Sequence, residues 1–352
     1  MRNTLTLLLL SLVISLQGQV ITKLSNGNST FYYDVTQLGD IVINSAAGDT
    51  IILPGGPINC FTVTVNKPLC FIGAGILSTG TPVTGKTVVT PSFNNDWVIQ
   101  AAGSGSSFHG IDFDRPVRFT GGVSNISFTR CAFSTFPMAG FNMTAPNNVQ
   151  IRQCLFRSGI TNGGTNAPQD LLIENSIIVG GIDFGSNDIA TALVTQCVLL
   201  DMITSAGENE GVTFTRNIFT RASSSYNVNS AASYQCNLFC MTTGNTLNWT
   251  GATDLGGNLG WQITPTNVFV NVPVFNTYNE TYDYHLTPNS PGLSSTMGCA
   301  EGEVGIYGGP PGSPWKDGAI PFNPHWISLS PSLGSTNGGV INVNLSGAAQ
   351  QN

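Results

Sequence analysis

The stretch FTRCAF at residues 128–133 recurs in altered form along the middle of the chain. Its seven copies are FHGIDF at 108–113, FTRCAF at 128–133, IRQCLF at 151–156, IENSII at 173–178, VTQCVL at 194–199, FTRNIF at 214–219 and YQCNLF at 234–239. The starting positions of successive copies give a period of roughly 21 residues. A fixed period in the twenties is typical of a solenoid, in which each repeat packs on the next.

Aligned copies place apolar residues in columns that indicate strands. One column is Phe133, Phe156, Ile178, Leu199, Phe219 and Phe239. A second lies five residues earlier, and a third lies two residues before the second. Columns two residues apart share one face of a strand, whereas a five-residue offset breaks that alternation and requires a bend. Each copy is therefore predicted to be strand, sharp bend, strand, with all three columns stacked inside the molecule.

The column at the bend contains small or amide side chains. Its members are Cys131, Cys154, Ser176, Cys197, Asn217 and Asn237. We expect these side chains to bond backbone groups or their equivalents one rung away, because buried polar groups need partners. A third short strand is expected after each bend, as at 117–119 and 182–184. Three strands per turn define a parallel β-helix.

Composition fits this architecture and argues against a nucleic-acid partner. Charged residues make up 9% of the 352 residues, against about 25% in ordinary globular domains, and 41 residues are glycine. Twelve basic and 19 acidic residues give a net charge of −7, without the basic stripe that a nucleic-acid surface requires.

The chain ends suggest export and capping. Residues 1–18, with Arg2 before a short apolar run, are predicted to be a secretion signal, although a buried N-terminal strand is the alternative. No other stretch could span a bilayer. Residues 19–45 are expected to cap the stack, with a short amphipathic helix over 34–44. Residues 310–352 are expected to form an exit segment and a short C-terminal hairpin.

The early rungs resemble those of a known superfamily. GDTIILPGG at 48–56 and KPLCFIGAG at 67–75 are each a strand closed by glycine-rich turns. The pairing resembles the opening of secreted right-handed parallel β-helix proteins of the pectate-lyase-like superfamily. This likeness covers about residues 46–309 and implies an all-β, right-handed parallel β-helix. Because the superfamily includes enzymes, binding proteins and structural proteins, it does not decide the activity.

The later rungs are similar to the closing rungs of bacterial surface β-helix proteins. The similarity lies in DYHLTPNSPG at 283–292, GIYGG at 305–309 and PFNPH at 321–325. Residues 267–272 read as one further rung. In longer relatives other modules follow this point, sometimes including a secretion and anchoring domain. The 26 residues after Trp326 are too few for such a domain, so we do not expect anchoring by that route.

The eight cysteines are expected to be mostly free. Cys131, Cys154 and Cys197 stand in the bend column, and neighbouring rungs give parallel Cβ directions that suit a disulfide poorly. We expect them to pack as small apolar side chains. Cys60 with Cys70 is the best candidate pair by spacing.

Catalytic candidates are weak. His109 and Asp112 are expected to face outward, with Asp114 and Arg115 in the following turn, so a base and carboxylates are present. A solvated turn with a local ion pair is the commoner explanation. Asp201, Glu208 and Glu210 could bind calcium, although a solvated loop is again more common.

A stripe of arginines is the candidate ligand-binding feature. Arg130 and Arg216 share an outward column, with Arg152 one position over, and such a stripe could meet acidic sugars. More often it is simply a solvent face.

The sequence therefore favours a secreted or cell-surface β-helix protein with a binding or structural role toward glycans or other surface components, without a cofactor. The alternative is a polysaccharide lyase acting on acidic polysaccharide.

Overall fold

A computed structural model describes most of the chain between residues 19 and 348. The described residues are 19–77, 85–92, 96–139, 146–162, 168–184, 191–200, 210–222, 226–228, 231–241, 247–297, 299, 302–309, 315, 325–331 and 343–348. The expected secretion signal lies outside them. Among the described residues no helix is long and apolar enough to cross a membrane.

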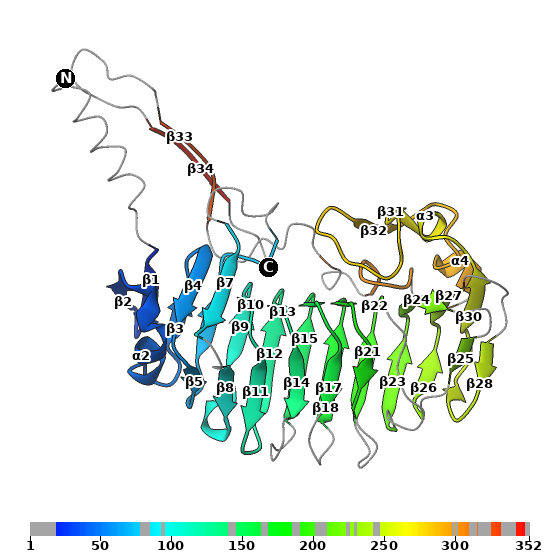
Figure 1. Ribbon diagram of the computed structural model, residues 1–352, viewed down its shortest axis with the longest axis horizontal. Helices are drawn as coiled ribbons and strands as arrows, with labels where there is room; N and C mark the ends of the chain where they lie inside the picture. Colours follow the sequence, from blue (N-terminus) through cyan, green and yellow to red (C-terminus); the bar gives the residue numbers. More distant parts are fainter. Residues whose placement is uncertain are drawn as a thin grey trace.

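Short strands stack into a parallel β-solenoid with one rung for each sequence repeat, as predicted (Figure 1). One side, sheet A, has twelve strands. In spatial order they are β2 (Asn28–Tyr32), β1 (Ile21–Ser25), β3 (Thr50–Ile52), β6 (Cys70–Ile72), β9 (Ser107–His109), β12 (Ser124–Thr129), β15 (Asn147–Arg152), β18 (Gln169–Glu174), β21 (Ala192–Thr195), β23 (Val212–Thr215), β26 (Ser233–Gln235) and β29 (Thr253–Asp254). The antiparallel pairings in this sheet involve β1, which pairs with β2 and β3.

Two further sides complete the coil. Sheet B contains β4 (Gly56–Cys60), β7 (Thr87–Pro91), β10 (Asp112–Phe113), β13 (Ala132–Phe133), β16 (Leu155–Phe156), β19 (Ile177–Ile178), β22 (Val198–Leu199), β24 (Ile218–Ala222), β27 (Leu238–Met241) and β30 (Leu259–Gln262). The third side contains β5 (Val63–Val65), β8 (Trp97–Gln100), β11 (Val117–Thr120), β14 (Phe136–Ala139), β17 (Ile160–Asn162), β20 (Ile182–Asp183), β25 (Tyr226–Val228) and β28 (Leu247–Trp249).

The predicted apolar column is one continuous file inside the coil. Register pairs join Phe133 to Phe156, Ile178, Leu199, Phe219 and Phe239 in turn. Each of these side chains is at most 1% exposed. The aromatic members stack ring on ring, with centroids 5.0 Å apart for Phe133–Phe156 and 4.7 Å for Phe219–Phe239. Side-chain burial repeated rung after rung is the main stabilising contribution to the stack.

The bend between sheets A and B uses one left-handed residue per rung. These residues are Gly110, Arg130, Gln153, Asn175, Gln196, Arg216 and Cys236, with φ between 45° and 65°. A single left-handed residue turns the chain sharply, at a cost of about 1–2 kcal/mol where the residue is not glycine. The hydrogen bonds described next offset that cost.

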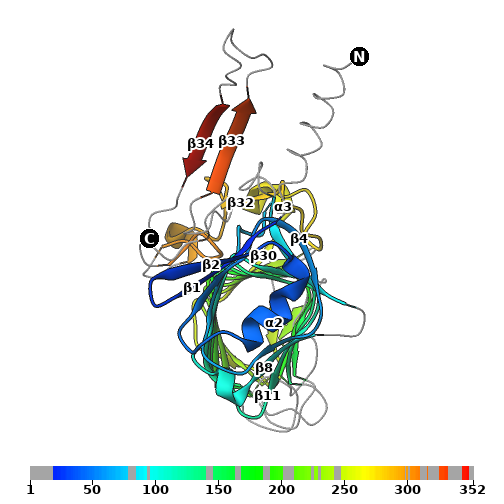
Figure 2. The ribbon, with the colours of Figure 1, turned by 90° about the vertical axis from the view of Figure 1, so that its left-hand side faces the viewer.

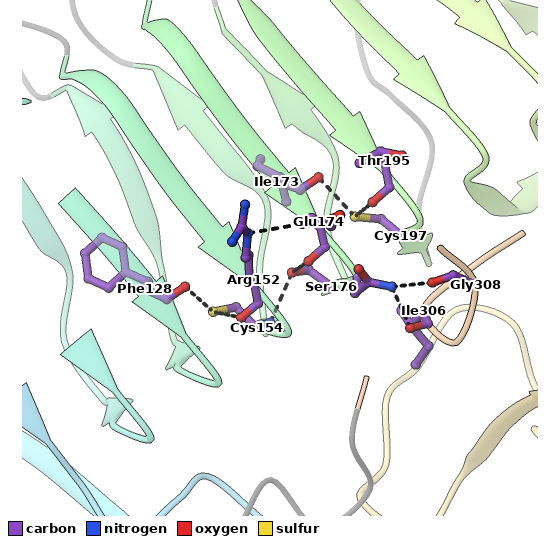
Figure 3. A network of polar contacts seen from close by, with 11 residues as sticks. Phe128, Arg152, Cys154, Ile173, Glu174, Ser176, Thr195, Cys197, Ile306 and Gly308 are labelled. Atoms are coloured by element: carbon purple, nitrogen blue, oxygen red, sulfur yellow. Dashed lines mark hydrogen bonds and ion pairs between the residues drawn. The ribbon is translucent and has the colours of Figure 1, made fainter. Parts of the chain in front are cut away.

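A ladder of side chains runs inside the bend, as the sequence predicted (Figure 3). In the earlier rungs Cys154 Sγ accepts from Cys131 N at 3.3 Å, and Ser176 Oγ accepts from Cys154 N at 3.0 Å. The corresponding hydrogen bonds are shorter in the rungs where an asparagine stands at the bend. Asn217 Oδ1 accepts from Cys197 N at 2.8 Å and Asn237 Oδ1 accepts from Asn217 N at 2.9 Å. Neighbouring bends are thereby tied together along the axis.

The N-terminal end is closed as expected, with one addition. The helix α2 (Leu38–Ile43) lies across the open end of the coil (Figure 2), with Leu38, Ile41 and Val42 buried on the core. Asp34 begins the preceding 3₁₀ turn η1 (Val35–Gln37) by accepting from Thr36 N at 3.0 Å. The antiparallel hairpin of β1 and β2 was not predicted.

The C-terminal part folds back over the outside of sheet B. This segment, residues 265–309, which we call the strap, contains α3 (Pro265–Val268), β31 (Phe269–Asn271), β32 (Asp283–Leu286) and α4 (Ser294–Met297). It lies above β22, β24, β27 and β30 in Figure 1. Since β31 pairs antiparallel with β32 and not with the stack, the prediction of a further rung at 267–272 is wrong.

The strap covers a second apolar cluster. The outward file of sheet B contains Ala132, Leu155, Ile177, Val198, Ile218 and Leu238, all buried. Val268, Phe269 and Tyr284 of the strap belong to the same cluster. A disulfide joins Cys236 to Cys299 and fixes the strap to the bend. The predicted C-terminal hairpin is confirmed as β33 (His325–Pro331) and β34 (Val343–Ala348).

Candidate functional site

Asp112, a predicted catalytic candidate, is a buried structural carboxylate. It faces outward from sheet B, as expected, but its side chain is 3% exposed, so the expected solvated position is wrong. Arg157 donates to both carboxylate oxygens, Nη1 to Oδ1 at 2.6 Å and Nη2 to Oδ2 at 2.7 Å. Lys86 Nζ lies 3.4 Å from Oδ2. Asp112 pairs with Ala132 in the outward file of sheet B, a file that we did not expect from the sequence to be covered.

The charges around Asp112 hold the end of the strap. Lys86 also reaches Glu280 of the strap, Nζ to Oε1 at 3.3 Å. Burial raises the pKa of Tyr278, and the negative charge of Glu280 raises it further. The side chains of Lys86 and Arg157 therefore face the carboxylates of Asp112 and Glu280, and these four residues lie far apart in the sequence. Such a matched cluster suits docking of the strap better than proton transfer.

The other catalytic candidates are not gathered around Asp112. His109 lies on sheet A, where burial lowers its pKa and the charge of Arg130 lowers it further. Asp114, in the turn after sheet B, accepts from Thr90 Oγ1 at 3.1 Å. Arg115 is half-buried in the same turn. The structure thus spreads the four residues over two sheets and a turn.

The expected arginine stripe does not exist as an open surface. Arg130 is 4% exposed at the left-handed bend position, and its Nε donates to Gln153 Oε1 at 2.8 Å. The carbonyl of Arg216 accepts from Gly305 N of the strap at 2.9 Å. Of the three arginines only Arg152 is well exposed, and its Nε lies 3.1 Å from Glu174 Oε2 (Figure 3). The strap crosses the bend file, where Asn175 Nδ2 donates to Ile306 O and Gly308 O.

The expectation of a calcium site at Asp201, Glu208 and Glu210 stays a prediction. Asp201 and Glu208 lie outside the described residues, and Glu210 is exposed in a turn. Within the described part of the chain, His, Cys, Asp and Glu form no group of three or more that could hold a metal ion.

The cysteine predictions are partly right. Cys131, Cys154 and Cys197 are buried free thiols, as expected. The Cys60–Cys70 pairing is wrong, since both are free. The actual disulfide links the solenoid to the strap, so it could be found only by knowing how the strap folds back.

The outer face of sheet A is the broad surface that the strap leaves open, and we call it the platform. Register pairs align two files of side chains along it, and none of these side chains is buried. The first file is Ser29, Leu24, Thr50, Cys70, Ser107, Ser127, Gln150, Leu172, Leu193, Thr213, Ser233 and Thr253. The second is Phe31, Thr22, Ile52, Ile72, His109, Thr129, Arg152, Glu174, Thr195, Thr215 and Gln235.

The platform is long and nearly uncharged. Twelve strands at about 4.8 Å spacing make it about 50 Å long. Hydroxyl and amide groups dominate it, and each can both donate and accept hydrogen bonds. The second file contains three ionisable side chains: His109, Arg152 and Glu174. The charges of Arg152 and Glu174 neutralise each other.

A shallow groove lies on the platform where β18, β21 and β23 begin. Its volume is about 540 Å³, and its lining is mainly apolar. The lining residues are Asp170, Leu171, Leu172, Thr191, Ala192, Leu193, Gly211 and Thr213. Leu193 is 38% exposed at its floor. The groove combines an apolar floor with hydroxyl and carboxylate groups at its edges, a combination that suits small ligands or polymer units.

Comparison with protein-family models, curated proteins and solved structures gave no match. The function must therefore be argued from the platform and the groove themselves.

Proposed function

We propose that the chain is a non-catalytic extracellular protein that binds an extended, largely uncharged polysaccharide along the platform. The single observation that carries this proposal is the open face of sheet A, about 50 Å of hydroxyl and amide side chains repeated rung by rung. A polymer of sugar units presents hydroxyl groups in the same repetitive manner. Leu172 and Leu193 would contact the apolar face of a sugar ring.

The charged groups favour binding over turnover. A lyase acting on acidic sugars needs a base and a cationic surface for the carboxylate. Arg157 and Lys86 are paired with carboxylates, and Arg130 is buried at the bend. A neutral platform offers little attraction to a polyanion, particularly on a chain with net charge −7.

Export to an oxidising compartment is part of the proposal. The Cys236–Cys299 disulfide supports it, because such bonds persist mainly in secreted and cell-surface proteins. The apolar run at residues 5–16 and the likeness to bacterial surface β-helix proteins point the same way.

Affinity electrophoresis through gels containing neutral or uronic-acid polysaccharides tests the proposal. We expect retardation by at least one neutral polymer, and no ultraviolet absorbance from unsaturated products. Absorbance that grows with time and disappears in Arg115→Ala would replace the proposal with a lyase. Absence of retardation by every neutral polymer would refute it.

A further inference from the structure

The N-terminal end of the solenoid carries the most exposed apolar side chains of the described chain. Tyr33 is 77% exposed, Phe61 71%, Phe31 57% and Ile43 55%. They lie on or beside β2, α2 and the turn after β4, the elements that close this end (Figure 2). Isolated exposed apolar residues are ordinary, but a group at one end of a molecule marks an interaction surface.

The same end presents an unpaired strand edge. β2 is the terminal strand of sheet A and pairs on one side only, with β1. Its two-residue turn, Asn26 and Gly27, fixes the register, so that alternate residues Ser29 and Phe31 direct their backbone N–H and C=O groups away from β1. Neither proline nor a charged side chain occurs within β2 to prevent another strand from pairing there.

We propose that this end is a dimer interface, in which β2 pairs antiparallel with β2 of a second copy of the chain. A register centred on Thr30 places Ser29 opposite Phe31 of the second copy, so the outward backbone groups of both strands meet. The same strand supplies both halves, as two-fold symmetry requires.

Charge and area favour a second copy as the occupant. Residues 19–67 contain two lysines and three aspartates, which gives this end a net charge of −1, compared with −7 for the whole chain. Electrostatic repulsion between two copies is therefore small at this end. At about 200 Å² per aromatic side chain, the exposed parts of Phe31, Tyr33 and Phe61 provide about 400 Å². This is half of the roughly 800 Å² that each partner contributes to a typical stable interface, and the edge of β2 and its polar flanks add to it.

Dimerisation would join two platforms into one. A two-fold axis through the β2 pair, perpendicular to the sheet, keeps both outer faces on the same side. The combined sheet would have 24 strands and a length of about 110 Å. The dimer itself does not depend on the proposed polysaccharide binding, and its test uses no ligand.

Engineered cross-linking tests the register. In Thr30→Cys the two new thiols would face each other across the axis, at the close Cβ separation that a disulfide requires. We expect a covalent dimer on non-reducing gels under mild oxidation. Thr253→Cys, at the opposite end of sheet A, is the matched control and should stay monomeric on the gel. The unsubstituted chain controls for its own thiols.

Analytical ultracentrifugation tests the surface. We expect a dimer with a dissociation constant of about 1 μM or tighter, and a monomer for the double variant Tyr33→Ser/Phe61→Ser. Trp261→Ser, which removes an exposed apolar side chain from the far end, should remain a dimer. A monomer at about 100 μM, a hundredfold above that constant, would overturn the proposal. So would a dimer that persists in the double variant, or cross-linking of Thr253→Cys equal to that of Thr30→Cys.

Discussion

Asn217 makes the ladder inside the bend open to a quantitative test. Its Oδ1 accepts from Cys197 N at 2.8 Å, and its Nδ2 donates to Val194 O at 2.9 Å. Asn217→Ala would leave the Cys197 N–H and the Val194 carbonyl without these bonds at a fully buried site. A buried polar group that loses its partner costs about 1–3 kcal/mol, so two such groups predict a loss of about 2–6 kcal/mol in the free energy of unfolding.

Two variants make this prediction specific. Asn217→Ser should recover part of the loss, because Ser176 already fills the same position and accepts from Cys154 N at 3.0 Å. Thr215→Ala, on the open platform nearby, should change stability by less than about 0.5 kcal/mol. Urea unfolding followed by circular dichroism gives the free energies of unfolding of the three variants. If the free energy of unfolding of Asn217→Ala were within about 0.5 kcal/mol of that of the natural chain, the ladder would not be stabilising the bends.

Three other predictions concern charge, disulfide and pH. Arg157→Met should destabilise the chain by about 3 kcal/mol, because Asp112 is left buried without its bidentate partner. Adding Asp112→Leu, which matches the leucines of the outward file, should restore most of the lost free energy of unfolding in the same assay. Replacing Cys236 and Cys299 by serine should cost roughly 4 kcal/mol, for a link across 63 residues, and should speed proteolysis of the strap. In the unfolded, unreduced natural protein six thiols per chain should react; eight would contradict the Cys236–Cys299 bond, and fewer than six would mean a further disulfide. Since the folded-state pKa of His109 is lowered, its contribution to stability is present above pH about 6.5 and is lost as the pH falls below that value. His109→Gln should therefore flatten the acid side of the stability profile, and an unchanged profile would contradict the partial desolvation of this imidazole.

The solenoid was predictable because its signal is local and repeated. The file from Phe133 to Phe239 and the bend residues Cys131 to Asn237 recur at the period of one rung, and both were confirmed in register and burial. Periodicity of this kind reports which side chains share a face.

The site predictions failed where the chain covers its own surface. Asp112 faces outward from sheet B as expected, yet it is buried, close enough to the strap for its charge to act on Tyr278. Arg130 was also expected outside and is buried at the bend. The strap lies far along the chain from Asp112, and a contact so distant leaves no period in the sequence. One signal was present: Leu155 and Ile177 stand in the outward file next to inward Phe156 and Ile178, and a strand apolar on both faces indicates that both faces are covered.

The platform was not recognised because its side chains are ordinary. Thr213 and Thr215 alternate with inward Val212 and Phe214, as any half-buried strand would. Only the stacking of twelve strands converts such residues into a continuous surface.

The central claim is tested most directly by measuring how two aspartate variants bind the neutral polysaccharide that retards the natural chain in affinity electrophoresis. Leu193→Asp places a charge on the groove floor, at a side chain 38% exposed, and Val274→Asp makes the same change on the strap, at a side chain 43% exposed. Titration calorimetry should show at least a tenfold weaker affinity for Leu193→Asp, equivalent to about 1.4 kcal/mol, and natural affinity for Val274→Asp. Equal affinities for Leu193→Asp and the natural chain would contradict binding along the platform.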